Sequence, residues 1–239
     1  MQKQKKVYYS NAFTLAEVLI TLAIMGTVMA LTIPTLFQST NQASFIDGLK
    51  KTYGILDTAT NQIMSNNAGT LIGAFTSSTD ARDNKYGNIL EYNKTCSVGS
   101  VVGNCWANFT GKLSIGASVE SFDANTNYQG AVLADGTFLL FYIPNTSCNG
   151  TGVSLNLPYA ATDKILCGYI VADVNGFNGP NIIGKDIFMF LLGSNGLYAG
   201  GEAHTIYNAA GNCNTKNTLK DGYGCASQVL NRQEINYST

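Results

Sequence analysis

Charged side chains are scarce in this chain of 239 residues: they make up only 12% of it, about half of the usual share of roughly 25%. Asn, Thr, Ser and Gly take their place, a mixture typical of surfaces that work outside the cell. The net charge is −1, and Lys3, Lys5 and Lys6 stand together at the N-terminus. No basic patch follows them, so we predict no nucleic-acid partner for the rest of the chain.

Catalytic signatures are also missing. The only histidine, His204, has no nucleophile pattern near it, and the chain has no G-x-S-x-G, H-E-x-x-H or phosphate-loop sequence. One histidine and no C-x-x-C pair argue against a zinc site. We therefore do not expect an enzyme, because a membrane-tethered enzyme would have only this histidine in its favour.

Cysteine, in contrast, occurs six times, and every copy lies beyond the long apolar segment described below. An even number in an exported region favours disulfides, although sequence alone does not choose among the many possible pairings. Each bond would stabilise the fold by roughly 2–4 kcal/mol. The simplest pairing joins sequential neighbours: Cys96–Cys105, Cys148–Cys167 and Cys213–Cys225.

The longest apolar run covers residues 13–37 and contains one charged residue, Glu17. A helix of about 20 apolar residues crosses a bilayer core, so this segment can span a membrane. The lysines precede it and the flank after it, residues 38–42, is uncharged. This asymmetry predicts that the N-terminus stays in the cytoplasm and that the remainder is exported.

Two simpler interpretations leave Glu17 unexplained. An ordinary signal peptide has a shorter core, with a small-residue cleavage site soon after it, and none follows here. A plain signal anchor explains the hydrophobicity and the orientation, but not a carboxylate inside the membrane helix, which costs about 2.5–3.5 kcal/mol. No basic residue lies within a helical turn of Glu17. Its partner would come from a neighbouring chain or from a new amino group made by cleavage.

The block AFTLAEVLITL, from Ala12 to Leu22, resembles the N-terminus of type IV pilins and pseudopilins. The resemblance implies that prepilin peptidase cuts between Ala12 and Phe13 and methylates Phe13. Glu17, fifth from Phe13, would then pair with the Phe13 ammonium of a neighbouring subunit and set the axial register. Ala12 is the one departure, because the family usually has Gly before the cut.

Gly26 and Pro34 fall where filament-forming pilins carry helix-loosening residues. Pro34 is expected to kink the helix or open it locally. Beyond it, apolar residues recur at helical spacing, which predicts that the helix continues to about Ser65 with one apolar stripe. Asn66 to Gly69 would end it. The stripe consists of Phe45, Leu49, Tyr53, Leu56 and Ile63.

The rest of the chain predicts an α+β fold. Residues 70–120 are rich in Thr, Ser, Asn and Gly, and we expect loops with short local elements there. Strands are predicted at 131–134 and 137–143, joined by a hairpin at Asp135-Gly136, and at 164–174 and 186–192, before a turn at 194–196. These strands would form an antiparallel sheet packed on the helix stripe.

The pattern D-x-N-G…P-N…G-x-D, from Asp173 to Asp186, resembles head domains of the pseudopilin type. Some related heads bind calcium, so the resemblance makes calcium the one candidate cofactor, with Asp173, Asn175 and Asp186 as oxygen donors. The structural alternative is a turn held by Asx-type hydrogen bonds and positive-φ glycine. The stretch 211–228, with Cys213 and Cys225, resembles the disulfide-closed region near pilin C-termini.

Together these features divide the chain into a cleaved cytoplasmic leader (1–12), a transmembrane and assembly helix (13–37), the exported half of that helix (38–67) and a globular head (68–239). The resemblance implies a structural subunit of a type IV pilus-like or pseudopilus filament. Its partners would be further copies in a helical homopolymer, minor pilins, prepilin peptidase, the inner-membrane assembly machinery and the membrane itself.

Such a subunit would reside in the inner membrane before assembly and in an extracellular or periplasmic filament afterwards. The alternative function is that of a membrane-anchored, exported binding or adhesion protein that does not polymerise. That alternative predicts no cleavage after Ala12 and indifference to substitution of Glu17.

Overall fold

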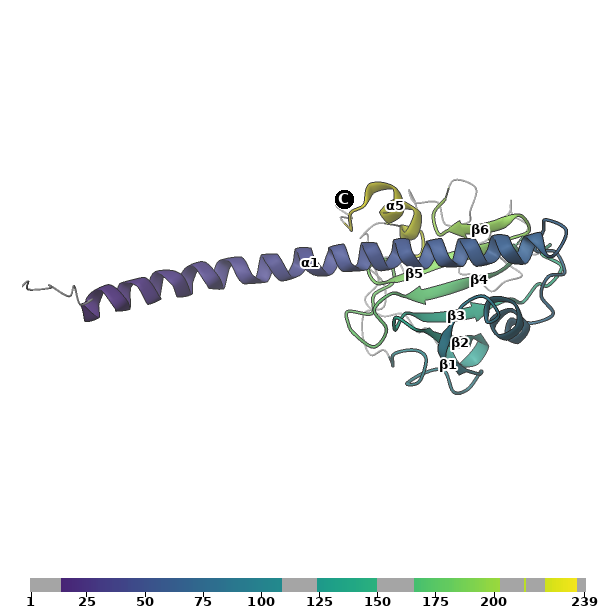
Figure 1. Ribbon diagram of the computed structural model, residues 1–239, viewed down its shortest axis with the longest axis horizontal. Coiled ribbons are helices and arrows are strands. Elements are labelled where there is room, and N and C mark those ends of the chain that lie inside the picture. Colours follow the sequence, from purple (N-terminus) through teal and green to yellow (C-terminus); the bar gives the residue numbers. More distant parts are fainter. Residues whose placement is uncertain (1–13, 109–123, 150–165, 203–212, 214–221, 236–239) are drawn as a thin grey trace, which may run out of the picture. The chain divides into compact units, whose positions relative to one another are not determined.

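The computed structural model describes residues 14–108, 124–149, 166–202, 213 and 222–235 (Figure 1). The chain divides into two compact units, Met1–Gln42 and Ala43–Thr239, which are described in turn. Outside the sheet the described elements are helices α1 (Leu15–Ser65), α2 (Ser78–Asp80), η1 (Ala81–Tyr86), α3 (Ala124–Asn127) and α5 (Cys225–Arg232).

In the first unit, the stretch of α1 from Leu15 to Thr32 is apolar almost throughout. Every described side chain from Thr14 to Thr32 is exposed, and Leu15 to Thr32 is long and apolar enough to cross a membrane. A helix that is hydrophobic all round needs an apolar environment. The helix assignment also continues through Pro34, and the kink or local opening expected at that residue stays a prediction.

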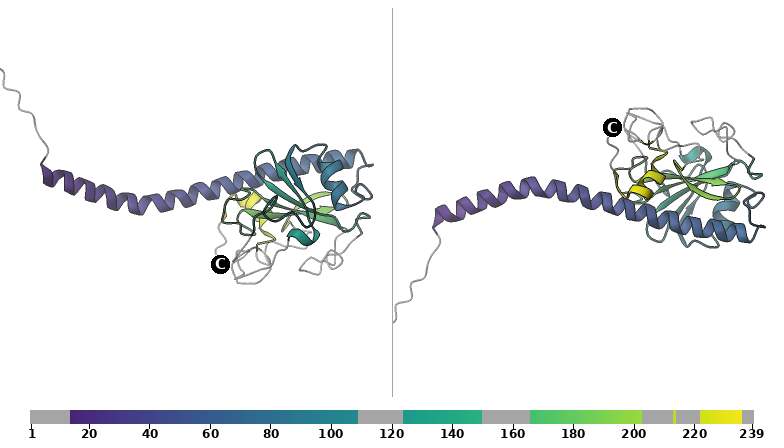
Figure 2. Two further views of the ribbon diagram at one scale, coloured as in Figure 1. Left: turned by 90° about the horizontal axis from the view of Figure 1, so that it is seen from below. Right: turned by 90° about the horizontal axis from the view of Figure 1, so that it is seen from above.

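In the second unit, the remainder of α1 packs along one face of a sheet (Figure 2). Phe45, Leu49, Leu56 and Ile63 are buried there. The Tyr53 ring lies 5.9 Å from that of Phe190. These contacts confirm the predicted apolar stripe. The helix ends at Ser65 as predicted.

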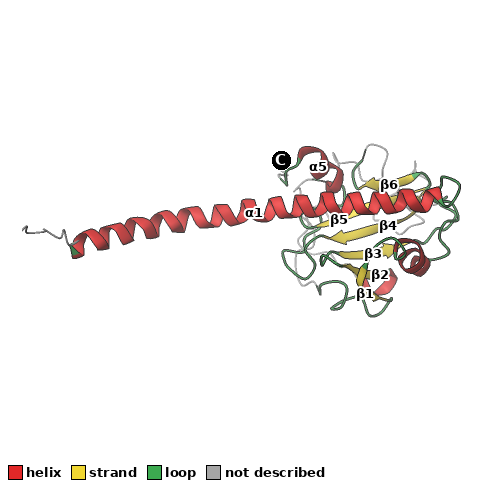
Figure 3. Ribbon diagram, in the orientation of Figure 1, coloured by secondary structure: helices red, strands yellow, loops and turns green. Residues whose placement is uncertain are grey.

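The sheet has six antiparallel strands whose spatial order follows the sequence (Figure 3). The predicted hairpin is confirmed, with Val132 opposite Phe138 and Gly136 at a φ of 89°. The fourth strand begins at Leu166, and Lys164, where we placed its start, lies outside the described residues. The strands are β1 (Tyr92–Cys96), β2 (Gln129–Leu133), β3 (Phe138–Tyr142), β4 (Leu166–Asp173), β5 (Ile187–Gly193) and β6 (Gly196–Ala199).

Two strands correct the prediction. Strand β1 lies inside the segment predicted to be loops, and β6 starts at the last residue of the predicted turn, Gly196. Strand β1 is at the edge of the sheet and its three central side chains are exposed. Its sequence Tyr-Asn-Lys-Thr-Cys shows no apolar alternation. The strand forms through backbone pairing with β2 and not through burial of its side chains, so the sequence did not predict it.

Both faces of the sheet are buried. Leu139 and Phe141 of β3 face the cluster that contains the α1 stripe, together with Ala226 and Val229 of α5. The alternate residues of β3 join a second cluster. There the cover comes from loop and turn residues, among them Trp106 and Tyr223. Antiparallel sheets commonly leave one face to solvent, so the continuous apolar strands here reflect a head with two covered faces.

Three disulfides join sequential neighbours, the simplest of the pairings considered: Cys96–Cys105, Cys148–Cys167 and Cys213–Cys225. The third begins helix α5, and the backbone N–H of Ser227 donates to the carbonyl of Gly200 at 2.9 Å. The C-terminal segment is thus fastened to the end of the sheet, as its resemblance to pilin C-termini implied.

Candidate functional site

The beginning of α1 forms a reciprocal cap between Thr14 and Glu17. The Thr14 backbone N–H and hydroxyl each donate to Glu17 Oε2 at 2.8 Å. In return, the Glu17 backbone N–H donates to Thr14 Oγ1 at 3.3 Å. This is a capping box, which satisfies two backbone donors that a helix start otherwise leaves unpaired. Glu17 therefore has a partner within its own chain.

Sequence reasoning missed this arrangement because it looked for a basic partner of Glu17. The available signal was the spacing T-x-x-E immediately before an apolar run, the usual signature of a helix start. The cleavage residues Ala12 and Phe13 lie outside the described residues, so the pairing of Glu17 with a neighbour's Phe13 stays a prediction. Gly26 lies in the exposed helix, and a Cβ placed on it would meet nothing within 4 Å.

The loop between β4 and β5 holds the D-x-N-G pattern in a tight turn. Asp173 Oδ1 accepts from the backbone N–H groups of Asn175 at 3.2 Å and Gly176 at 3.1 Å. Gly176 has a φ of 64°, and a Cβ at this position would lie 2.6 Å from the carbonyl oxygen of Gly136. Only glycine fits there without a backbone shift.

The second half of the pattern is held by Asp186. Its Oδ2 and Oδ1 accept from the backbone N–H groups of Asn181 at 2.7 Å and Ile182 at 2.6 Å. With its carboxamide nitrogen turned into the loop, Asn181 also donates to Asp173 Oδ2 at 3.0 Å. The Asn175 side chain donates to the carbonyl of Gly179 at 2.9 Å. Hydrogen bonds within the loop thus reach both carboxylates.

Both aspartates are fully buried. Burial, reinforced by the nearby charge of Asp186, raises the pKa of Asp173 to about 8. Burial also raises the pKa of Asp186. The hydrogen bonds from the loop amides act in the opposite direction, but burial has the larger effect. Asp173 therefore favours holding a proton in the folded head at neutral pH.

These contacts bear on the calcium prediction. Calcium takes six to eight oxygen ligands, whereas all four carboxylate oxygens of Asp173 and Asp186 already accept N–H groups of the loop. Within the described residues no group of three or more His, Cys, Asp or Glu side chains could hold a metal. The geometry favours the structural turn. Calcium binding stays a prediction, and a thermal-shift series with calcium and a chelator that showed no difference would reject it.

Comparison with known proteins identifies the N-terminal segment. Residues 9–33 match the profile described as the prokaryotic N-terminal methylation motif, the prepilin cleavage motif of type IV pilins and pseudopilins. The predicted resemblance is confirmed for this segment. The chain is pilin-like at its N-terminus, with a prepilin-peptidase processing motif and an apolar helix suited to anchoring it in a membrane. Neither the curated proteins nor the solved structures give a match. His204 lies outside the described residues.

Proposed function

We propose that this chain, as the bearer of a prepilin-type methylation motif, is a structural subunit of a type IV pilus-like or pseudopilus filament. The observation that carries the proposal is the combination of that motif at residues 9–33 with a helix whose described side chains from Thr14 to Thr32 are all exposed. In this proposal prepilin peptidase removes residues 1–12 and methylates Phe13.

The exposed helix requires two successive apolar environments. Before assembly the lipid bilayer covers Leu15 to Thr32, and after assembly the same segments of neighbouring subunits cover one another. Association of helices within a membrane depends on close packing and on polar contacts rather than on the hydrophobic effect. A Cβ on Gly26 would meet nothing within 4 Å, so this position offers a neighbouring helix a place to approach closely. Pro34 supplies a position without a backbone N–H donor.

Glu17 would guide assembly through its charge. In the isolated subunit the capping box holds the carboxylate at the helix start, where the helix dipole favours a negative charge. Removal of the leader creates an ammonium group at Phe13. Because a lone charge inside the membrane is costly, pairing of Glu17 with the Phe13 ammonium of a neighbour favours one axial register.

The head would form the surface of the filament. Its polar, weakly charged composition and its three disulfides are typical of an oxidising compartment outside the cytoplasm. We assign no catalytic step to it. The partners in this proposal are further copies of the chain, minor pilins, prepilin peptidase and the inner-membrane assembly machinery, and the destination is an extracellular or periplasmic filament.

Mass spectrometry of the N-terminal peptide from the native cell envelope tests the processing step. We expect a peptide that begins at Phe13 and is heavier by one methyl group. A chain that still begins at Met1 or Gln2, in cells that contain the peptidase, would contradict the proposal and favour a membrane-anchored binding protein that does not polymerise. Material sheared from the cells then separates the two filament types, because a surface pilin appears in it and a pseudopilin does not.

A further inference from the structure

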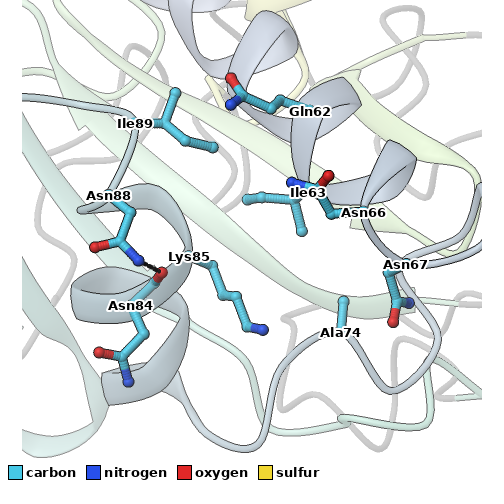
Figure 4. Close-up of a pocket in the computed structure, with 9 residues that line it drawn as sticks. All are labelled: Gln62, Ile63, Asn66, Asn67, Ala74, Asn84, Lys85, Asn88 and Ile89. Atoms are coloured by element: carbon cyan, nitrogen blue, oxygen red, sulfur yellow. Dashed lines mark hydrogen bonds between the residues drawn. The ribbon is translucent and has the colours of Figure 1, made fainter.

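The head contains a polar cavity of about 270 Å³ between the end of α1 and the segment that begins with η1 (Figure 4). Its volume is near the lower end of the usual range for small-molecule sites, which suits a ligand of the size of one sugar ring. All of the lining residues belong to the second unit of the chain. They are Gln62, Ile63, Asn66, Asn67, Ala74, Asn84, Lys85, Asn88 and Ile89.

The lining is dominated by carboxamides. Five of the nine residues are Asn or Gln, and each carboxamide can both donate and accept hydrogen bonds. Asn67 is held in place, because its Nδ2 donates to the carbonyls of Thr70 at 2.7 Å and Ile72 at 3.0 Å. Gln62 and Asn66 are exposed, and neither side chain hydrogen-bonds to another described residue. Their amides are therefore available to hydroxyl groups of a ligand.

One cation stands among these amides. Lys85 extends from η1 into the space that faces α1 (Figure 4), and its side chain is half-buried. Among the described residues it makes no ion pair shorter than 4 Å. Its charge helps to lower the pKa of Asp80, whose carboxylate already accepts from Thr76 at 2.9 Å and Asn84 at 2.9 Å. The Lys85 ammonium thus remains open to an anionic group.

The two walls of the cavity are fixed to each other. The hydroxyls of Thr60 on α1 and Tyr86 on η1 are 2.7 Å apart, and both residues are fully buried. The stretch that carries Asn84 and Lys85 is a π-helix, a rare conformation that recurs at functional sites. A site held in this way is pre-organised, which reduces the ordering cost of binding.

From this arrangement we propose that the cavity binds a sugar ring that carries a carboxylate, as in a uronic or sialic acid residue of a glycan. The Lys85 ammonium takes the carboxylate, and the amides of Gln62 and Asn66 take hydroxyl groups. The apolar wall formed by Ile63, Ala74 and Ile89 contacts the C–H face of the ring. Every lining residue lies in the second unit of the chain, beyond the apolar segment Leu15–Thr32, so binding here does not require that segment to assemble into a filament.

Ligand-observed NMR and calorimetry on the full chain test the proposal. The protein is placed in phospholipid nanodiscs, since detergents with sugar headgroups would compete. Glucuronate is compared with glucose and with acetate. We expect glucuronate to bind at least about 5-fold more tightly than either, because only glucuronate engages both the ammonium and the amides. Acetate binding as tight as that of glucuronate, or no saturable response to glucuronate, would overturn the proposal.

Two variants make the test specific. Lys85→Gln is expected to weaken glucuronate binding about 5-fold, to the level of glucose, while changing glucose binding less than about 2-fold. Lys50→Gln removes one positive charge from α1 outside the cavity. It is expected to change neither glucuronate binding nor glucose binding. Circular dichroism checks that both variants are folded. An equal effect of the two substitutions would mean that only the overall charge matters, and would reject the site.

Discussion

The two parts of α1 differ in composition, since the first is apolar almost throughout and the second carries a single apolar stripe, and they find their apolar surroundings in different places. From Leu15 to Thr32 every side chain is exposed and the helix start is held by its own cap. From Phe45 to Ile63 one stripe is buried against the head's sheet. The stripe from Phe45 to Ile63 is covered within the chain, whereas the segment from Leu15 to Thr32 needs an apolar environment from outside it.

This difference separates two kinds of sequence information. The head residues of α1 specify a fold, since their partners lie in the same chain. The N-terminal residues specify an environment and, in the proposed function, an assembly. Substitutions between Leu15 and Thr32 should therefore change assembly without lowering the stability of the head. Substitutions in the head should lower its stability without preventing leader cleavage.

The largest expected effect comes from Glu17→Gln. Gln also completes a capping box, so the helix start stays intact while the charge is lost. We expect subunits to accumulate in the membrane with an unchanged head, and filaments to be lost from the sheared or purified fraction, as judged by immunoblot and electron microscopy.

Thr14→Val is the matched control for that experiment. It removes the hydroxyl of the cap but keeps the charge of Glu17, and it should cost the helix start about 1 kcal/mol without abolishing filaments. Normal assembly of Glu17→Gln would show that the charge pair has no role.

The next largest effect concerns the head alone. Cys148 and Cys167 are fully buried and close a loop with a sequence separation of 19. Replacing both with Ser should lower the free energy of unfolding by about 2–5 kcal/mol, because the unfolded chain gains the entropy of an open loop. Denaturant titration of the full chain measures this loss. Leader cleavage should be unchanged, and a loss of cleavage in this variant would break the separation between the two stretches.

A pH-dependent effect follows from the buried carboxyl of Asp173. Its pKa rises to about 8 in the folded head, against about 3.9 in an unfolded chain. The folded state therefore keeps a proton that the unfolded state loses as the pH rises. The contribution of Asp173 to the free energy of unfolding is fully present below about pH 4. It declines as the pH rises toward about 8, by up to about 1.4 kcal/mol per pH unit.

Asp173→Asn should flatten this decline, since Asn can still accept at Oδ1 from the loop amides but has no proton to lose. Thermal melts of both proteins between pH 4 and pH 8 check the slope. Parallel slopes for the two proteins would contradict the assignment of the pH dependence to Asp173.

The smallest effect concerns the ion pair between α1 and the β2–β3 turn. Lys51 Nζ lies 2.7 Å from Asp135 Oδ2, but the Lys51 side chain is 58% exposed. Exposed ion pairs contribute only about 0.2–1 kcal/mol. Lys51→Met should therefore lower stability by less than about 1 kcal/mol, a difference that should shrink further in high salt. A loss above about 2 kcal/mol would indicate that this contact determines how the helix lies on the sheet.

What the sequence predicted well was governed by strong local patterns. The helix end at Ser65, the hairpin at Asp135-Gly136 and the sequential disulfides all depend on residues close together in the chain. The methylation motif is likewise a local signature. The predictions for strands β4 and β5 succeeded because buried strands are continuously apolar.

What it missed depends on contacts that leave no such pattern. Strand β1 is defined by its backbone pairing with β2. The cavity beside Lys85 lies between segments that are distant in sequence and that the Thr60–Tyr86 hydrogen bond joins. The spacing of Thr14 and Glu17 does predict the capping box, but only a basic residue was considered as a partner for Glu17, and Thr14 is neutral.

In the proposed function, where the head is exported, the sequential order of the six strands has a consequence for how the head reaches its fold. Each strand pairs with the strand just before it in the chain, and the three disulfides span sequence separations of only 9, 19 and 12. If the N-terminal part of the head is exported first, each new strand can thus pair with the strand before it, and each cysteine pair can be oxidised, before later segments arrive. Such local closure favours rapid folding and leaves few opportunities for cysteines to join wrong partners, even where no enzyme reshuffles them.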